Sequence, residues 1–258
     1  MSTYKGIDCA SEISATAAKQ IKASGYDFVC RYLVPPTMAW KDLTAQEARN
    51  ICDAGLKILC VFEATADRVK GGAAAGTNDG LTARMLAEAM GMPITAYIYF
   101  AVDYEAPASD IAMIDAYLRA ARAQTGTYEI GVYGPYSVIE AIATRGACKG
   151  FWQCFAWSYG KVSDHRMVYQ YKAGQTVAGI AVDLDEAYSL DGLWTYNTES
   201  EREKMIRYNT IADVPDWGKP TVQKLIDAGA LKGTKDGLNL SEDMLRILVI
   251  NDRMGLYR

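Results

Sequence analysis

Residues 96–103, Ala-Tyr-Ile-Tyr-Phe-Ala-Val-Asp, form the strongest strand pattern in the chain. The stretch is almost wholly apolar and rich in aromatic and branched side chains, which is typical of a strand that is buried on both faces. It ends on Asp103, and a second carboxylate, Glu105, follows two positions later. A buried strand of this kind indicates an α/β protein with a parallel sheet, and its acidic end is the first place to look for chemistry.

Similar apolar segments alternate with amphipathic segments on both sides of this strand. The other expected strands are Lys5–Cys9, Phe28–Leu33, Leu56–Glu63, Ile130–Tyr133, Phe151–Trp157, Val168–Tyr171 and Ile180–Leu184. The last three lie only about ten residues apart, which is too short for a full crossover helix. Eight strands with five helices predict an irregular (β/α)8, TIM-like barrel over residues 1–195, with its late helices reduced. A doubly wound open sheet is the competing topology.

The chain changes character after Trp194. Residues 196–208 are polar and highly charged, which predicts a linker. Residues 209–258 have room for two helices, one that starts near Pro220 and one that Ser241 can cap. A small α-helical C-terminal module of this size is marginally stable alone. We therefore expect it to lean on the barrel or on a second copy, which would make the protein a homo-oligomer.

Composition and termini exclude several classes of partner. The net charge is −4 and Lys and Arg form no patch, so no nucleic acid is expected as partner. No apolar run approaches the roughly 20 residues of a membrane span, and the first residues lack a signal-peptide pattern, so we expect no membrane partner and a cytoplasmic start. Six irregularly spaced cysteines predict core thiols, and the single histidine, His165, lies in a polar stretch. Neither a metal site nor a cofactor is expected.

Carboxylates gather where the expected strands end. They are Asp8, Glu63, Asp103, Glu105, Asp183 and Asp185. In a β/α barrel the active site lies at this rim. Because side chains two residues apart on a strand share a face, Asp103 and Glu105 are expected to point together into the mouth, as are Asp183 and Asp185. Strands one and eight are neighbours in a closed barrel, which would bring Asp8 beside Asp183.

Crowded carboxylates suit the hydrolysis of glycosidic bonds. They cannot all stay ionised, so one gains a raised pKa and can act as an acid while another stabilises or attacks the sugar. Capping of strand ends, ion pairs with Arg31 and Lys172, or a magnesium-dependent or calcium-dependent phosphodiesterase are the alternatives. Aromatic residues near the strand ends favour a sugar over a phosphate. The residues expected to bind substrate are Glu63, Tyr133, Gln170, Asp185, Tyr32 and Arg31.

Five segments in fixed order resemble a known family. They are Gly6–Asp8, Gly25–Tyr32, Lys41–Thr44, Ile98–Tyr104 and Gly131–Gly134. They resemble the glycoside hydrolase-like domain, long catalogued as a domain of unknown function, which is related to the Chalaropsis-type lysozymes of glycoside hydrolase family 25. The resemblance covers residues 4 to 190. It implies a catalytic set of Asp8, Asp103, Glu105 and Asp183, with Glu105 as general acid and Asp103 orienting the N-acetyl group of the substrate.

The C-terminal residues resemble a second module. The segments Ile211–Trp217 and Val222–Gly229 are similar to one S-layer-homology repeat and to the tails of Firmicute phage and prophage endolysins. The resemblance implies binding to a wall polymer, with assembly of the protein as the alternative. Together the two resemblances imply a phage-type or prophage-type endolysin, an N-acetylmuramidase that acts on bacterial peptidoglycan and stays cytoplasmic until holin-dependent release to the cell wall. A non-catalytic protein that binds wall glycan is the other hypothesis.

Overall fold

The structure, a computed structural model, describes residues 3–196, 207–233, 237–238 and 240–257. The chain divides into two compact units, residues 1–196 and residues 197–258. The division falls one residue from the barrel boundary expected at residue 195. Most of the linker expected at residues 196–208 lies outside the described residues.

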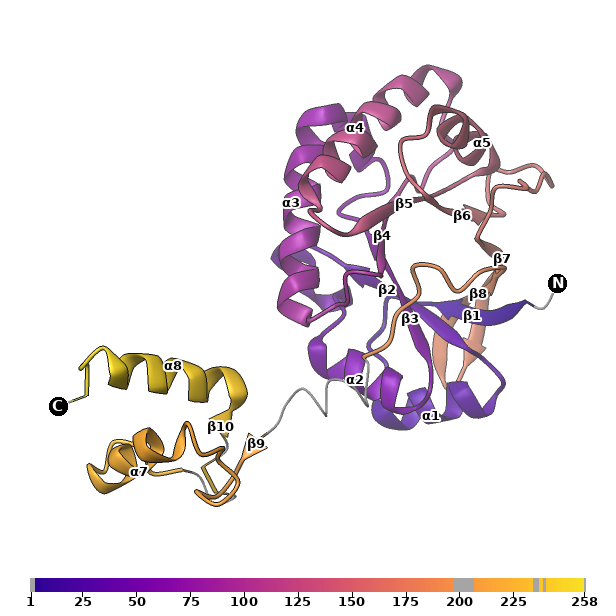
Figure 1. Cartoon of the computed structure of the whole chain (residues 1–258). Helices are drawn as coiled ribbons and strands as arrows, with labels where there is room; N and C mark the ends of the chain where they lie inside the picture. Colours follow the sequence, from indigo (N-terminus) through magenta and orange to yellow (C-terminus); the bar gives the residue numbers. More distant parts are fainter. Residues whose placement is uncertain (1–2, 197–206, 234–236, 239, 258) are drawn as a thin grey trace. The chain divides into compact units, whose positions relative to one another are not determined.

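Eight strands of the first unit close into a barrel in sequence order (Figure 1). They are β1 (Tyr4–Asp8), β2 (Phe28–Leu33), β3 (Lys57–Phe62), β4 (Tyr97–Ala101), β5 (Glu129–Gly134), β6 (Gly150–Cys154), β7 (Val168–Val177) and β8 (Ile180–Ala187). The predicted TIM-like barrel is confirmed, and the open-sheet alternative is wrong.

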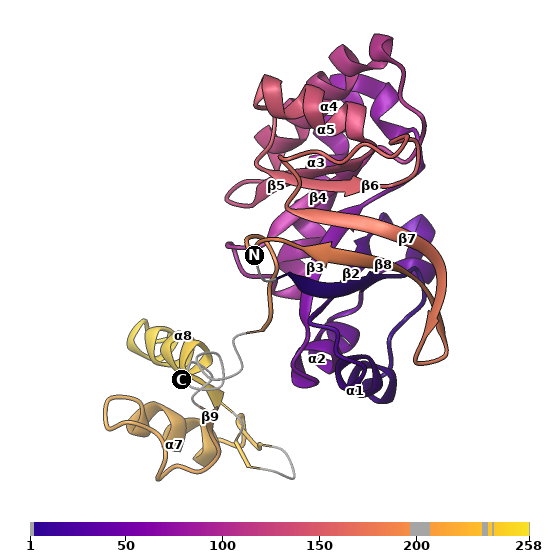
Figure 2. The ribbon, with the colours of Figure 1, turned by 90° about the vertical axis from the view of Figure 1, so that its right-hand side faces the viewer.

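The last strand runs against its neighbours. The pairings from β1 through β7 are parallel, whereas β8 is antiparallel both to β7 and to β1. Only Ala178 and Gly179 separate β7 from β8, and so short a turn permits a hairpin but not a parallel crossover. Figure 2 shows this hairpin as a long ribbon beside β1. The first half of β8, rather than its C-terminal end, therefore lies at the mouth of the barrel. In the antiparallel register of β1 and β8, Asp183 is the partner of Asp8 there.

The helices lie outside the strands (Figure 1). They are α1 (Ala15–Ala23), α2 (Ala45–Asp53), α3 (Gly72–Met90), α4 (Ile111–Gln124) and α5 (Tyr136–Arg145), with 3₁₀ turns η1 (Pro36–Lys41), η2 (Arg68–Gly71) and η3 (Ala108–Asp110). Residues 150–187, all described, contain no helix. The reduction of the late helices is thus confirmed.

The barrel has two apolar layers, one between strands and helices and one inside the ring of strands. The interior layer includes the large side chains of Phe28, Tyr99 and Trp152. Gly131 makes room for Tyr99, because a Cβ atom at this position would lie 2.5 Å from the ring. After β8, Trp194 exchanges backbone hydrogen bonds of 2.7 and 2.8 Å with Ile58 at the start of β3. The segment up to residue 196 therefore belongs to the barrel.

All six cysteines are free and buried, as predicted, and His165 is exposed. Within the described ranges, none of the helices has the length and apolar character that a membrane crossing requires.

The second unit contains the two expected helices and a small sheet. α7 (Lys219–Asp227) begins with Pro220 in its first turn, and α8 (Glu242–Arg253) follows Ser241. The strands β9 (Arg207–Tyr208) and β10 (Leu240–Ser241) pair antiparallel. Tyr208, Val222 and Leu245 are among the residues of its own apolar core. Strands of two residues carry no alternating pattern, so the sequence did not indicate this sheet.

Candidate active site

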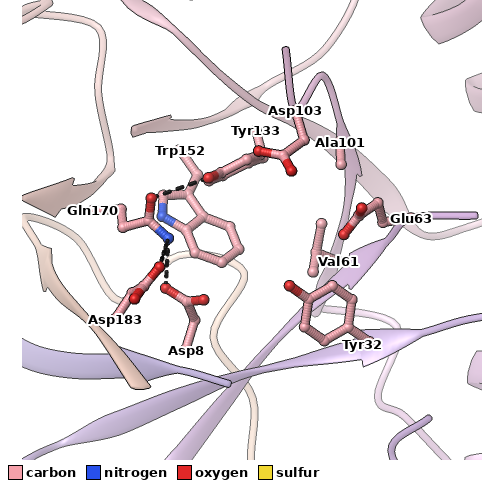
Figure 3. Close-up of a pocket in the computed structure, with 10 residues that line it drawn as sticks. All are labelled: Asp8, Tyr32, Val61, Glu63, Ala101, Asp103, Tyr133, Trp152, Gln170 and Asp183. Carbon is pink, nitrogen blue, oxygen red and sulfur yellow. Dashed lines mark hydrogen bonds between the residues drawn. The ribbon is translucent and has the colours of Figure 1, made fainter. Parts of the chain in front are cut away.

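A pocket opens at the mouth of the barrel, where the carboxyl ends of the parallel strands meet (Figure 3). It encloses about 420 Å³ of space that is continuous with solvent. Its lining residues are Asp8, Tyr32, Val61, Glu63, Ala101, Asp103, Tyr133, Trp152, Gln170 and Asp183. Four carboxylates therefore surround one space, and each is positioned by a different strand, namely β1, β3, β4 and β8.

On one side of the pocket, Gln170 on β7 forms hydrogen bonds with three other lining residues. Its Nε2 atom donates hydrogen bonds to Asp8 Oδ2 (2.8 Å) and to Asp183 Oδ2 (3.4 Å), and its Oε1 atom accepts one from the Tyr133 hydroxyl (3.0 Å). The backbone N–H of Gly174 also donates to Asp183 Oδ1 at 2.8 Å. The amide of Gln170 can satisfy these partners in one orientation only, so it fixes the positions of both carboxylates.

On the other side of the pocket, Lys41 lowers the pKa values of two carboxyl groups, those of Glu63 and Asp103. Its Nζ atom lies 3.4 Å from Glu63 Oε2 and 4.4 Å from the centroid of the Tyr32 ring. Burial raises the pKa of Glu63, and Lys41 partly offsets the rise. Burial also raises the pKa of Asp103; Lys41 lowers it, and the charge of Asp183 raises it further. Lys41 lies in η1, away from any strand end, so its place in the segment Lys41–Thr44 of the family resemblance did not indicate a role in the pocket.

Asp185 lies below the pocket and does not line it. Because β8 runs away from the mouth, Asp185 pairs with Gly6, two residues deeper than the pairing of Asp183 with Asp8. Asp185 is fully buried, and Trp152 Nε1 donates a hydrogen bond of 2.8 Å to its Oδ1 atom. The prediction that Asp185 contacts substrate is therefore wrong, since it rested on a strand running in the opposite direction.

Asp8 and Asp185 are buried carboxyl groups that interact with each other, and the pKa of each is raised. Burial raises the pKa of Asp185 well above its ordinary value, and the charge of Asp8 and a hydrogen bond with Asp8 raise it further. Burial raises the pKa of Asp8 to about 6, although hydrogen bonds from Gln170 and Asp185 pull it down. The hydrogen bond between the two carboxyl groups lowers the pKa of Asp8 and raises that of Asp185, so Asp185 is its donor. Among the described residues, the buried Asp185 Oδ2 has no further hydrogen-bond partner.

Arg31 is also not a substrate contact, and that prediction is wrong. The guanidinium is fully buried, where Nε and Nη2 donate to the two oxygens of Glu47 at 2.6 and 3.1 Å. Nη1 donates to the Cys9 carbonyl at 2.6 Å. Side chains alternate along β2, so Tyr32 faces the barrel interior while Arg31 faces the helices.

Glu105 lies outside the pocket. β4 ends at Ala101, and the Asp103 N–H donates to the Ala66 carbonyl at 3.0 Å, so the backbone is no longer a strand beyond that point. Asp103 lines the pocket, whereas the exposed Glu105 accepts a hydrogen bond from the Tyr159 hydroxyl in a separate hollow. The expected convergence of Asp103 and Glu105 is not found, because residues share a face at this spacing only while the chain stays extended.

The carboxylates surround the pocket without converging on a point. Over the part of the chain that the structure describes, no three His, Cys, Asp or Glu side chains are grouped closely enough to hold a metal ion. What the pocket offers instead is a carboxyl with a pKa near 6 beside other carboxylates and an aromatic wall. That combination suits acid catalysis on a sugar.

Comparison with known proteins finds relatives of this barrel among glycoside hydrolase-like domains. The family described as "Rv2525c-like, glycoside hydrolase-like domain" matches residues 19–189. A Mycobacterium tuberculosis protein named "Putative peptidoglycan hydrolase Rv2525c" is 30% identical over 185 residues, which cover 66% of this chain and 75% of that protein. A crystal structure of Rv2525c with L-tartrate has a TM-score of 0.67 and 28% identity, covering 75% of this chain and 98% of that one.

Two other comparisons extend over the same barrel. The uncharacterized Bacillus subtilis protein FadG is 29% identical over 158 residues, which cover 55% of this chain but only 27% of FadG. The Streptococcus pneumoniae virulence factor GHIP, a glycosyl hydrolase 25, has a TM-score of 0.51 at 14% identity, covering 73% of this chain and 88% of that one. At this identity the likeness shows a shared fold with a family 25 enzyme.

Proposed function

Because the chain belongs to the Rv2525c-like family of glycoside hydrolase-like domains, we propose that its barrel hydrolyses the glycan strands of bacterial peptidoglycan. One observation carries the proposal: four carboxylates surround a pocket with an aromatic wall, and one of them has a pKa raised to about 6. A protonated carboxyl beside an ionised one is what cleavage of a glycosidic bond requires. The relationship to Rv2525c, whose name specifies peptidoglycan, supports the choice of substrate.

We assign the general acid to Asp8. The family resemblance gives this role to Glu105, but Glu105 faces a different hollow. Asp8 lines the pocket and holds its proton at mildly acidic pH. In the proposed step, the Asp8 proton passes to the glycosidic oxygen as the bond to the anomeric carbon breaks. Asp185 then stabilises the Asp8 carboxylate by the hydrogen bond that it donates.

Asp103 takes the role of orienting the substrate amide. Figure 3 shows Asp103 and Asp8 on opposite sides of the pocket, so a sugar ring between them can meet both. The Asp103 carboxylate would accept a hydrogen bond from the acetamide N–H of N-acetylmuramic acid, while the acetamide oxygen attacks the anomeric carbon and forms an oxazolinium ring. Water then adds to the anomeric carbon as this ring opens, and its proton passes to the Asp8 carboxylate, which restores the acid. Asp183 and Gln170, which are fixed by their mutual hydrogen bond, would bind sugar hydroxyls. This makes the enzyme an N-acetylmuramidase.

Purified cell walls test the proposal directly. The full-length protein is incubated with walls, the new reducing ends are reduced with borohydride, and the amino sugars are analysed after acid hydrolysis. Reduced muramic acid is the expected product, and Asp8→Asn should give almost none. Reduced glucosamine would contradict the bond specificity. Walls that carry bound protein but no new ends would instead support the non-catalytic glycan-binding protein.

We further propose that the second unit binds the wall and that the protein acts as a phage-type endolysin, reaching the wall after holin-dependent release. The S-layer-homology-like sequence of this unit supports wall binding, as does a hollow lined by Trp217, Arg246, Val249, Ile250 and Arg253. Trp217 is 41% exposed there, although aromatic rings are usually buried. Assembly through this unit is the alternative, and a chain truncated after Tyr196 separates the two.

A further inference from the structure

A second hollow adjoins the carboxylate pocket on the rim of the barrel. Its main lining residues are Glu105, Tyr136, Trp157, Tyr159 and Lys161, and we call it the aromatic hollow. Two chain segments contribute to both sites. Asp103 and Tyr133 line the pocket, and residues two or three positions further along each segment line the aromatic hollow. Residues two apart are separated by at most about 7 Å between Cα atoms, so the two sites are neighbours.

The loop that supplies the aromatic rings is strained. This aromatic loop, residues 155–161, is the first part of the segment that connects β6 to β7. Of the three non-glycine residues with positive φ in the described part of the chain, two lie here, namely Trp157 (φ 53°) and Tyr159 (φ 52°). A bulky residue in this conformation costs free energy and persists only where its surroundings hold it.

Buried hydrogen bonds hold the aromatic loop in place. The Ser158 hydroxyl is buried, donates to the Cys154 carbonyl at 2.6 Å and accepts from the Tyr136 N–H at 2.9 Å. Gln153, also buried, donates to the Lys161 carbonyl at 2.8 Å. The rings themselves are exposed, Trp157 by 37% and Tyr159 by 78% of their surface. The backbone conformation of this loop thus lowers the stability of the fold, while its aromatic faces remain exposed to solvent. Packing of the loop against the barrel does not explain this exposure.

We propose that the aromatic hollow binds the N-acetylglucosamine ring next to the sugar held in the carboxylate pocket. The ring would stack on Trp157 and Tyr159, whose faces suit the C–H surface of a sugar. Glu105 can accept hydrogen bonds from its hydroxyls or amide, and Lys161 can donate to them. The hydrogen bond that the Tyr159 hydroxyl donates to Glu105 fixes the positions of both side chains before a sugar binds. This inference rests on the proposed function, because it takes a glycan as the occupant of the pocket.

The test measures binding rather than turnover. In the Asp8→Asn background, calorimetry compares N-acetylmuramic acid with the uncut tetrasaccharide of alternating N-acetylglucosamine and N-acetylmuramic acid. We expect the tetrasaccharide to bind more tightly, and Trp157→Gly to weaken it about 10-fold while leaving the monosaccharide unchanged. Glycine tolerates positive φ, so Trp157→Gly should have an equal or higher Tm.

Ala178→Gly is the matched control, since Ala178 (φ 51°) lies in the β7–β8 turn and relieves the same strain away from the hollow. It should not change tetrasaccharide affinity. Tyr159→Ala, at a strongly exposed position, provides a second loss of stacking with no risk to folding. Unchanged tetrasaccharide affinity in both Trp157→Gly and Tyr159→Ala would overturn the proposal. If cell walls gain no new reducing ends but the variants show the predicted affinities, hydrolysis is refuted. The proposal that the aromatic hollow is a sugar-binding subsite would still hold.

Discussion

Among single residues, Asp8 links the stability of the fold to pH. Its pKa is raised from an ordinary 3.8 to about 6, so the folded protein binds this proton more tightly than the unfolded chain does. The stabilising contribution is therefore complete below about pH 4 and is lost as pH rises through about 6. We expect Asp8→Asn, which cannot ionise, to be more stable than the natural protein at pH 7 by on the order of 2 kcal/mol.

Urea unfolding of both proteins between pH 4 and pH 7 measures this difference. The gap in the free energy of unfolding should open as pH rises from 4 to 7. Curves that stay parallel across this range would contradict the shifted pKa of Asp8. Asp185→Asn is a useful companion, because burial raises the pKa of Asp185 well above its ordinary value and an asparagine, which carries no charge, can keep the bonds to Trp152 and Asp8. It should change stability and turnover little at pH 7.

Arg31 illustrates a residue whose role is structural rather than catalytic. Its pair with Glu47 is fully buried, and Glu47 also accepts the Ile13 N–H at 2.8 Å. Arg31→Met leaves a buried carboxylate without its cation, which should cost about 3–5 kcal/mol of unfolding free energy. Lys22→Met is the control, because the Lys22–Asp27 pair is about 40% exposed and should cost no more than about 1 kcal/mol. Equal losses in the two variants would contradict the structural role of Arg31.

At the scale of elements, the packing of α3 against α4 depends on a glycine. A Cβ atom at Gly80 would lie 2.4 Å from the Ala121 carbonyl oxygen, a backbone atom that cannot move aside. Gly80→Ala should therefore destabilise the barrel by about 1–3 kcal/mol, although alanine favours a helix. Asn78→Ala, on the exposed face of the same helix, should be neutral or slightly stabilising. Thermal unfolding of the two variants tests this, and a stabilising Gly80→Ala would refute the close approach.

Elements also show how far the sequence could predict the site. The strong strand patterns and carboxylate ends were enough to predict the barrel and the proximity of Asp8 to Asp183. The direction of β8 was not predictable in the same way, because strand patterns are identical in both directions, and this error misplaced Asp185. Glu105 was misplaced for a related reason, since the apolar pattern continues through Val102 and does not show that the strand stops at Ala101. Lys41 and the strained aromatic loop carry no periodic signal at all.

At the scale of the whole molecule, the barrel should be independent of the second unit. The Tyr196 hydroxyl donates to the Met90 carbonyl at 2.6 Å, so a truncation must keep residue 196. We expect the chain truncated after Tyr196 to fold, to cleave soluble glycan and to pellet less with purified walls than the full chain does. Light scattering on both chains tests assembly in the same experiment.

Three outcomes of this truncation are informative. An unfolded barrel would contradict the division into two units. Equal pelleting of both chains would refute a wall-binding role for the second unit. A full chain whose mass is a multiple of its monomer, with a monomeric barrel and unchanged pelleting, would favour assembly as the role of this unit.

We infer that the carboxylate pocket cleaves the glycan with Asp8 as the acid. The most direct measurement is kcat on soluble uncrosslinked glycan for Asp8→Asn and Glu105→Gln, side by side near pH 5. Loss of a general acid typically lowers the rate on the order of 10²–10⁴-fold. We predict a loss of this size for Asp8→Asn, and less than about 10-fold for Glu105→Gln, whose effect should fall mainly on KM. The claim would be contradicted if Glu105→Gln abolished turnover while Asp8→Asn retained it.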